Sequence, residues 1–419
     1  MQKYLIWTVV LLTFVFRAVA WTQEQPQLVS QPNRQRELTT EERLKVLTEA
    51  WGLVKDTFYD PKLNGVPWDS VKSEFTPQFE AARTAGEVAD LLRQLVATLH
   101  ASHIGLLTHE EYIQTQHILP FFFERVNGLS FVSYVFEPKD GSTVPLRVGD
   151  ELISVDGSDA KVLRLPSVTS VYPVFTNPYY GPAGSTAALR IRRSGSELVV
   201  NVQRIRRFDD VRAMCTNSLD GNIQHVRFLK FDSGTVPLSD ISALLKTVSA
   251  ADALIIDLRN CVGGDDSVDS LLSGALIGSD MPLYASLKRG MTAQDSGKTT
   301  AFSRKTDSPF TKPVAVLVNG NTESEPEVFT AVMKEYKRVR VFGSTTRGAF
   351  NGASEATGLS FKSGILAIPV ERVVTAAGNE YEGRGVTPDS AIANTEQDFA
   401  AGRDAVLDAA VAYLRRICN

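Results

Sequence analysis

Ser324 stands where a covalent nucleophile could act, between a predicted strand and a predicted helix. The apolar run 314–318 is typical of a buried strand, an Asn-Gly turn follows, and a helix is expected over 325–335. A hydroxyl at the amino end of a helix lies where partial positive charge stabilises a developing oxyanion. Ser324 and Glu327 also fit a plain capping box, so a structural role stays open.

Gly263 and Gly264 form a second candidate element, after an apolar strand over 253–258. Glycines let backbone N–H groups turn inward, as an oxyanion hole requires. The residues that follow lack the Lys and Ser/Thr of a phosphate-binding loop, and Gly-x-Gly-x-x-Gly spacing is absent, which disfavours nucleotide binding. A purely structural turn into the next helix is an equal alternative.

A serine nucleophile needs a general base, and the sequence holds only five histidines. His103 follows a predicted helix that begins at Thr84 and ends near Ala101-Ser102. No histidine forms His-Glu-x-x-His or another metal-ligand spacing, so neither a metal nor a cofactor is expected. The structural alternative for His103 is an interaction with the last carbonyls of that helix.

Three segments are expected to position these residues. Capping boxes at Thr39 and Thr84 and apolar residues at helical spacing predict a helical domain over 39–117. Residues 118–208 read as a mostly β module, and 209–419 alternate strands with helices. The fold class predicted is therefore α+β and multidomain.

The chain begins like an exported protein. Lys3, the apolar run 5–16 and Ala18-Val19-Ala20 predict a signal peptide over 1–20, with an uncleaved anchor as the alternative. No later segment is apolar enough to span a membrane. Residues 21–38 are polar and rich in Gln and Pro, which predicts a flexible lead-in to a secreted protein.

Composition excludes some partners. The 419 residues carry 44 Lys and Arg against 48 Asp and Glu, a net charge of −4, which gives no bulk reason to bind nucleic acid. Three cysteines are too few for a disulfide framework. One basic cluster is expected to be a solvated hairpin face: Arg190, Arg192, Arg193, Arg204, Arg206 and Arg207.

Taken in order, the motifs resemble the carboxy-terminal processing, or tail-specific, protease family over nearly all of the predicted mature chain. Gly149-Asp150 with Asp156-Gly157 correspond to the family's PDZ-like domain, and Asp257-Leu258-Arg259-Asn260 with Gly263-Gly264 correspond to its oxyanion segment. The family's nucleophile turn corresponds to Leu317–Gly320 with Thr322-x-Ser324-x-x-Glu327. Its late signature corresponds to Gly385–Asp389. The resemblance implies a crotonase/ClpP-like serine protease core over 209–419 and a PDZ-like domain over 118–208.

One departure decides which branch the chain resembles. Members with a Ser-Lys dyad place a lysine where this sequence has Ala349, and the guanidinium of neighbouring Arg347 stays protonated and makes a poor base. The tricorn core protease and the chlamydial protease-like activity factor use Ser-His-Glu instead. That resemblance implies Ser324 as nucleophile, His103 as base and Glu382 as its orienting carboxylate, with Gly263 and Gly264 at the oxyanion hole.

The expected function is that of a secreted serine endopeptidase acting on protein or peptide substrates through an acyl-enzyme. The alternative is a non-catalytic, retinoid- or peptide-binding protein on the same fold, since the core also resembles the interphotoreceptor retinoid-binding protein. Ala349 and Glu325-Pro326 favour this alternative. A homo-oligomer is one option for the assembly, which the sequence leaves open.

Overall fold

The computed structural model describes residues 34–165, 177–359 and 364–418. The predicted signal peptide lies outside these residues. Among the helices within them, none has the length and apolar character needed to cross a membrane.

Three helices pack together at the start of the described chain. The capping boxes predicted at Thr39 and Thr84 are confirmed, with Glu42 and Glu87 as the partners. The apolar faces of the helices form one buried cluster. The elements are α1 (Thr40–Thr57), η1 (Leu63–Gly65), α2 (Trp68–Ala81) and α3 (Ala85–Ala97).

Residues 34–38, the described end of the predicted flexible lead-in, are held against the start of α3. Backbone N–H groups of Ala85 and Gly86 donate to carbonyls of Arg36 and Arg34, each at 2.9 Å. Leu38 is 4% exposed. The prediction of flexibility is wrong for these five residues, because Leu38 has an apolar cluster to enter and the backbone has donors to satisfy.

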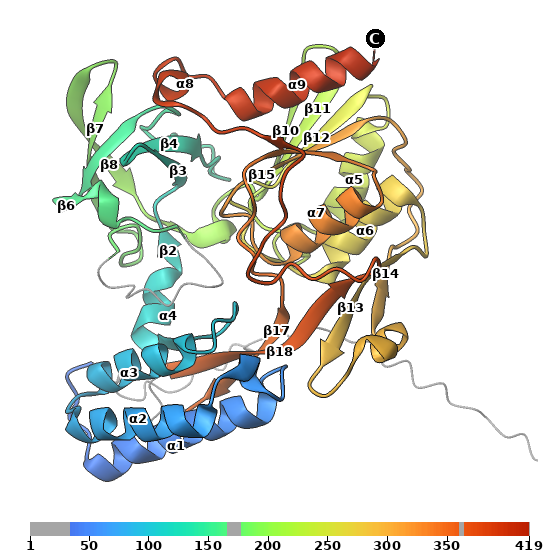
Figure 1. Ribbon diagram of the computed structural model, residues 1–419. Helices are drawn as coiled ribbons and strands as arrows, with labels where there is room; N and C mark the ends of the chain where they lie inside the picture. The colour runs from blue at the N-terminus through green and yellow to red at the C-terminus, as the bar shows by residue number, and fades with distance from the viewer. Residues whose placement is uncertain (1–33, 166–176, 360–363, 419) are drawn as a thin grey trace, which may run out of the picture. The chain divides into compact units, whose positions relative to one another are not determined.

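An antiparallel sheet joins the helices to the rest of the chain. Its long strand β18 pairs with β1 at one end and with β13 at the other, and its Leu366 and Ile368 enter the buried cluster of the helices. Figure 1 shows β17 and β18 running beside α1 and α3. The elements are β1 (Gly105–Thr108), α4 (His109–Thr115), β13 (Pro282–Lys288), η5 (Ala293–Lys298), β14 (Thr300–Phe302), β17 (Gly352–Gly358) and β18 (Gly364–Thr375).

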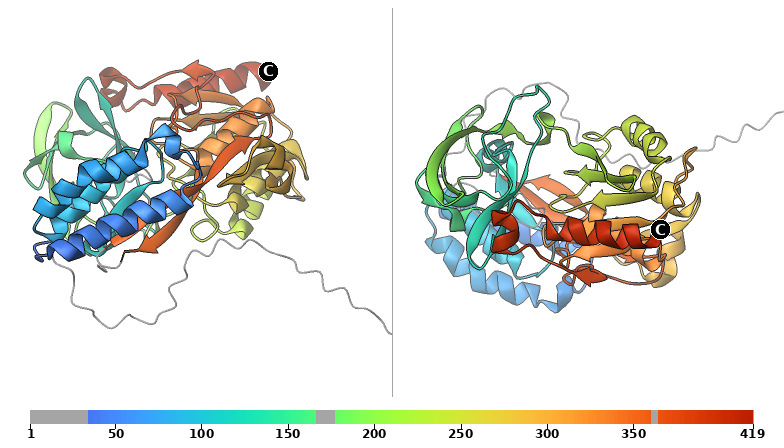
Figure 2. Two further views of the ribbon diagram at one scale, coloured as in Figure 1. Left: turned by 60° about the horizontal axis from the view of Figure 1, so that its bottom comes forward. Right: turned by 90° about the horizontal axis from the view of Figure 1, so that it is seen from above.

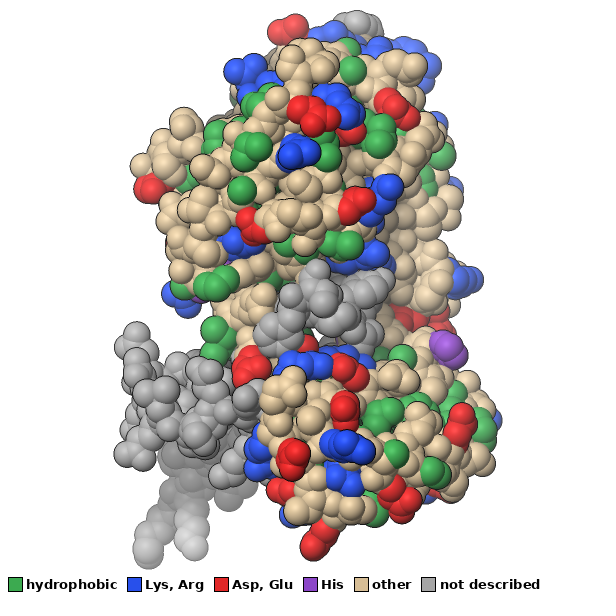
Figure 3. Space-filling view, turned by 90° about the vertical axis from the view of Figure 1, so that its left-hand side faces the viewer, with side chains coloured by type: hydrophobic (Ala, Val, Ile, Leu, Met, Phe, Trp, Pro, Cys, Tyr) green, Lys and Arg blue, Asp and Glu red, His purple; other side chains and the backbone are tan. Residues whose placement is uncertain are grey.

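The mostly β module is an antiparallel sheet in the order β3-β4-β5-β7-β8, with β6 beside β5. Its arginines are not all solvated: Arg204 is 6% exposed and pairs with Asp156 at 3.0 Å. Acidic and basic side chains alternate over the face in Figure 3. The elements are β2 (His117–Ile118), β3 (Phe121–Val126), β4 (Leu129–Val135), β5 (Glu151–Val155), β6 (Ser158–Asp159), η2 (Ala160–Val162), β7 (Thr186–Arg193), β8 (Ser196–Gln203), β9 (Ile205–Arg206) and η4 (Arg207–Asp209).

The core sheet has the order β10-β11-β12-β15-β16-β19, parallel except for β10. Alternate residues of β12 face opposite layers: Leu254 and Ile256 pack with α5, α6 and α7, whereas Ile255 packs with α9. Figure 2 shows α9 across one face. The elements are β10 (Met214–Leu219), β11 (Ile223–Phe228), α5 (Leu238–Val248), β12 (Ala253–Asp257), α6 (Asp266–Ile277), β15 (Val314–Val318), α7 (Glu325–Glu335), β16 (Arg340–Gly343), β19 (Ser390–Ala391), α8 (Glu396–Ala400) and α9 (Ala405–Cys418).

Candidate active site

Ser324 lies at the carboxyl edge of the parallel strands, directly before α7. This is the edge where open α/β sheets place ligands. Its φ is +62°, which is uncommon for a non-glycine residue and costs about 1 to 3 kcal/mol. Two acceptors hold its N–H: the carbonyl of Ala349 at 3.0 Å and Glu327 Oε2 at 3.1 Å. The strained turn is therefore fixed both by the first turn of α7 and by the segment at Ala349.

The structure brings His103 to Ser324 although 221 residues separate them in sequence. His103 Nε2 lies 3.1 Å from Ser324 Oγ, within hydrogen-bonding reach. Burial lowers the pKa of His103 from 6.5 to about 4. The imidazole is therefore neutral near pH 7 and can accept the serine proton.

Glu382 reaches the histidine through Ser102, a residue that the sequence reading did not assign. Ser102 Oγ lies 2.8 Å from His103 Nδ1 and donates to Glu382 Oε2 at 3.0 Å, while the Ser102 N–H donates to Glu382 Oε1 at 2.7 Å. Because the hydroxyl proton goes to Glu382, Nδ1 must carry its own proton and donate to Ser102. That tautomer leaves Nε2 as the acceptor for Ser324. The only available signal was a serine directly before the candidate base.

Glu382 is also tied to the segment that follows Ala349. The N–H groups of Phe350 and Asn351 each donate to Glu382 Oε2 at 2.8 Å. Since Ala349 accepts from Ser324, residues 349–351 connect the nucleophile to the carboxylate through backbone alone.

Gly263 is not placed as the sequence suggested. Its N–H donates to the carbonyl of Glu323 at 3.0 Å, so the expectation that this group serves an oxyanion hole is wrong. The bond exists because residues 261–263 run parallel to the segment before Ser324.

Gly264 remains a candidate for the oxyanion hole. The Gly263 carbonyl accepts from the Phe231 N–H at 3.0 Å, and the Asp265 N–H donates to the Phe231 carbonyl at 3.0 Å. Because the peptide bond between Gly263 and Gly264 is planar and trans, the Gly264 N–H points opposite to the Gly263 carbonyl and therefore away from Phe231. A Cβ at Gly264 would lie 1.8 Å from the Phe231 carbonyl oxygen, so only glycine fits.

The position of the missing lysine is filled by a small apolar group. Ala349 is fully buried, and Arg347 pairs with Glu323 at 3.1 Å and donates to Asn321 at 2.9 Å. The neighbouring cation is thus engaged in holding the turn before Ser324.

Glu327 links the nucleophile turn to the same segment. Besides the Ser324 N–H, its carboxylate accepts from the Thr346 hydroxyl at 2.5 Å and from the N–H groups of Gly348 and Ala349 at 2.6 and 2.8 Å. Burial nevertheless raises the pKa of Glu327 to about 7. The capping glutamate expected from the sequence therefore also anchors residues 346–349.

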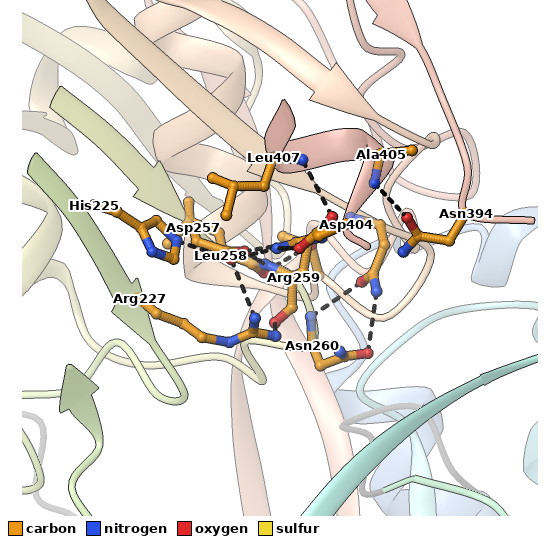
Figure 4. Close-up of polar contacts among 12 residues, drawn as sticks. His225, Arg227, Asp257, Leu258, Arg259, Asn260, Asn394, Asp404, Ala405 and Leu407 are labelled. Atoms are coloured by element: carbon orange, nitrogen blue, oxygen red, sulfur yellow. Dashed lines mark hydrogen bonds and ion pairs between the residues drawn. The ribbon is translucent and has the colours of Figure 1, made fainter. Parts of the chain in front are cut away.

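A network of charged side chains holds the segment 257–260, which leads into the glycine pair (Figure 4). Arg259 bonds to Asp257 and forms a two-pronged pair with Asp404 at 2.9 and 2.8 Å. Burial alone would raise the pKa of Asp257, but Arg227 and Arg259 hold it well below its usual value. Asn260 accepts from two asparagines of the nucleophile turn. These motif residues fix the glycine pair against the turn that carries Ser324.

Residues 222–392 match peptidase family S41, and residues 39–97 match the tricorn protease C1 domain. A carboxyl-terminal-processing protease of Synechocystis sp. is 22% identical over 402 residues, which cover 92% of this chain and 89% of that protein. Tricorn protease homolog 1 of Streptomyces coelicolor is 24% identical over 401 residues, 88% of this chain and 34% of that one.

The fold is also that of solved relatives. Mature CPAF complexed with lactacystin aligns with a TM-score of 0.60 at 13% identity, over 90% of this chain and 98% of that one. The nucleophile turn, the glycine pair and Glu382 all fall inside the matched residues 222–392. Residues 222–392 therefore match a peptidase family S41 domain, and the chain is a serine-type peptidase similar to carboxyl-terminal-processing proteases.

Proposed function

We propose that this protein is an exported endopeptidase that cleaves protein or peptide substrates through Ser324, His103 and Glu382. The observation that carries the proposal is the 3.1 Å contact between Ser324 Oγ and His103 Nε2, made by a histidine that burial keeps neutral. A serine hydroxyl is too weakly acidic to attack a peptide without such a base.

The reaction is acyl transfer. Ser324 Oγ attacks the peptide carbonyl carbon while its proton moves to His103 Nε2, and the cation that forms is stabilised by Glu382 through Ser102. His103 then gives this proton to the leaving amine as the carbon–nitrogen bond breaks. A water molecule, deprotonated by the same histidine, attacks the ester and releases the second product and free Ser324.

The oxyanion is assigned to two backbone donors. One is the N–H of Glu325, the first residue of α7, whose N–H has no partner within the helix itself. The other is the Gly264 N–H, which points away from Phe231 in a segment that pairs with Glu323 beside the nucleophile. Both lie at fixed backbone positions, which is what stabilisation of a developing charge requires.

The finer architecture belongs to the same proposal. The antiparallel sheet over 118–208 would be a PDZ-like domain, and the core over 209–419 a crotonase/ClpP-like domain. A helical domain would span 39–117. The signal predicted over 1–20 would export the chain, and a homo-oligomer is its candidate assembly.

A non-catalytic binding protein on this fold is the second candidate. Buried Ala349, at the position of the dyad lysine, is the observation that favours it. It would bind a peptide or a small apolar ligand without cleaving it.

A fluorophosphonate separates the two candidates, because it reacts only with an activated serine. We expect Ser324 of the purified protein to be labelled and unfolded protein substrates to be cleaved. Ser324→Ala should abolish both, while Ser73→Ala, at an exposed serine on α2, should change neither. Absence of labelling and of cleavage in the folded wild type would favour the binding protein.

A further inference from the structure

Two carboxyl groups lie in contact directly behind the nucleophile turn. Glu325, the residue after Ser324, turns its carboxyl inward, where Tyr284 Oη donates to its Oε1 at 3.1 Å. The same carboxyl interacts with that of Asp269 on α6 within hydrogen-bonding range, although neither ionised group has a proton to donate. Asp269 is 0% exposed and accepts from Ser273 at Oδ1. Asp269 Oδ2 finds no other donor within the described residues.

This contact needs a proton. Two ionised carboxylates give no donor between them and repel strongly where water is excluded, so a buried pair of this kind shares one proton. Burial, followed by the mutual negative charge, raises the pKa values of both groups.

The charged groups around the pair do not replace that proton. Asp266, in the exposed first turn of α6, adds a further negative charge, and Tyr284 of β13 is neutral. Arg304 is a cation that acts on Asp266, and it is not among the groups that act on Asp269 or Glu325.

The position of Glu325 connects the pair to catalysis. Its backbone N–H is one of the two proposed oxyanion donors, and it is joined to the strained Ser324. A displacement of the Glu325 side chain is therefore expected to shift the backbone of the first turn of α7 and of Ser324.

We propose that Asp269 and Glu325 are positioning residues that hold the nucleophile turn in its reactive geometry only while they share a proton. The inference rests on the proposed serine mechanism. When the shared proton is lost, two carboxylates repel in a closed site and Glu325 is displaced. Activity then falls on the alkaline side, independently of His103, which is already neutral there.

The test is the pH dependence of fluorophosphonate labelling and of kcat/KM from about pH 5 to about pH 9. Glu325→Gln keeps a donor toward Asp269 without a titrating proton. For wild type we expect the rate at the alkaline end to fall about tenfold or more below its maximum. For Glu325→Gln and Asp269→Asn it should stay within about twofold of each variant's own maximum.

Asp266→Asn gives a signed control, because the negative charge of Asp266 raises the pKa values of the pair. Its removal should move the alkaline fall to lower pH. Asp69→Asn, on exposed α2, should leave the profile of wild type unchanged. An alkaline fall of the same size and position in Glu325→Gln as in wild type would overturn the proposal.

Urea unfolding separates this inference from the proposed function. The folded pair binds more protons than the unfolded chain, so the free energy of unfolding should decrease as pH rises, and less so in Glu325→Gln. An equal decrease in both proteins would contradict the shared proton. Absence of labelling at every pH would instead overturn the serine mechanism.

Discussion

At the scale of single residues, the reactivity of the site depends on which nitrogen of His103 carries the ring proton. Ser102 lies between Glu382 and His103 and selects the tautomer in which Nε2 is the acceptor. Glu382 in turn receives three backbone N–H groups as well as the serine hydroxyl. Hydrogen bonds thus hold the Glu382 carboxylate rigidly, and Ser102 in turn orients the His103 ring.

Removal of the Ser102 hydroxyl should lower kcat more than it changes KM. In Ser102→Ala the backbone N–H still reaches Glu382, but Nδ1 loses its acceptor, so we expect kcat to fall about 10- to 100-fold. His103→Ala should lose about 10⁴-fold, since it removes the base itself. Steady-state kinetics on a fluorogenic peptide measure both. Recovery in Ser102→Thr, which restores a hydroxyl, would support the assigned role, and an unchanged kcat in Ser102→Ala would refute it.

The acid limit of activity should lie below the ordinary histidine range. Burial lowers the pKa of His103 to about 4, and only the neutral imidazole can accept the proton of Ser324. We therefore expect kcat/KM to persist below pH 6.5 and to fall as pH approaches about 4. Between these values the unfolded chain binds more protons at this residue, so stability also decreases as pH falls. A kcat/KM profile with its acid midpoint at 6.5 or above would contradict the buried, neutral base.

The sequence allowed Ser324, His103 and Glu382 to be proposed, because each sits in a short motif whose order resembles a known family. No motif predicted the role of Ser102, the hydrogen bond between the Gly263 N–H and the Glu323 carbonyl, or the pairing of Glu325 with Asp269. Each depends on hydrogen bonds between segments far apart in sequence, and no local pattern encodes which N–H finds which carbonyl.

At the scale of elements, the site lies where four segments converge: the residues between α3 and β1, the turn before α7, the segment 346–351 and the segment after β18 that carries Glu382. Local periodicity predicted α7, β12 and β15 within one residue, whereas α3 ends at Ala97, before the predicted end near Ala101-Ser102. It did not predict β13, β17 and β18. The stability of these strands comes from pairing across the chain, as when β18 binds β1 and β13 at different ends.

The glycine segment should tolerate no side chain at its second position. In Gly264→Ala the new Cβ would lie 1.8 Å from the Phe231 carbonyl oxygen, so the backbone must move and the adjacent N–H with it. We expect fluorophosphonate labelling to drop by about 10²-fold or more, in line with loss of an oxyanion donor. Gly52→Ala, in the open middle of α1, is the matched control and should stabilise the fold by about 0.5 to 1 kcal/mol. Labelling of Gly264→Ala at the wild-type rate would remove this segment from the oxyanion hole.

At the scale of the molecule, the described residues from 34 onward form one compact unit, in which the segments expected as domains contact one another. Contacts cross each expected boundary. Phe131 of the β module stacks on Phe399 beside α8, with ring centroids 5.0 Å apart. Arg227 of the core lies over the ring of Tyr134 at 4.0 Å. The helices, which carry the base, share their cluster with β18 of the segment that follows the nucleophile.

The helices and the core should therefore unfold in one transition. Leu366 and Ile368 of β18 are at most 1% exposed within the helical cluster, so Leu366→Ala should cost about 2 to 5 kcal/mol of unfolding free energy. Because β18 also pairs with β13, this loss should lower the urea midpoint measured by two probes. One is tryptophan fluorescence, to which Trp51 and Trp68 of the helices contribute, and the other is loss of labelling at Ser324 in the core. Val199→Ala, at a 63% exposed position, should shift neither. Two separate midpoints would mean that the helices fold alone and that His103 reaches Ser324 only when they dock. Coincident midpoints would mean that the histidine and the serine are held together by the same cooperative core.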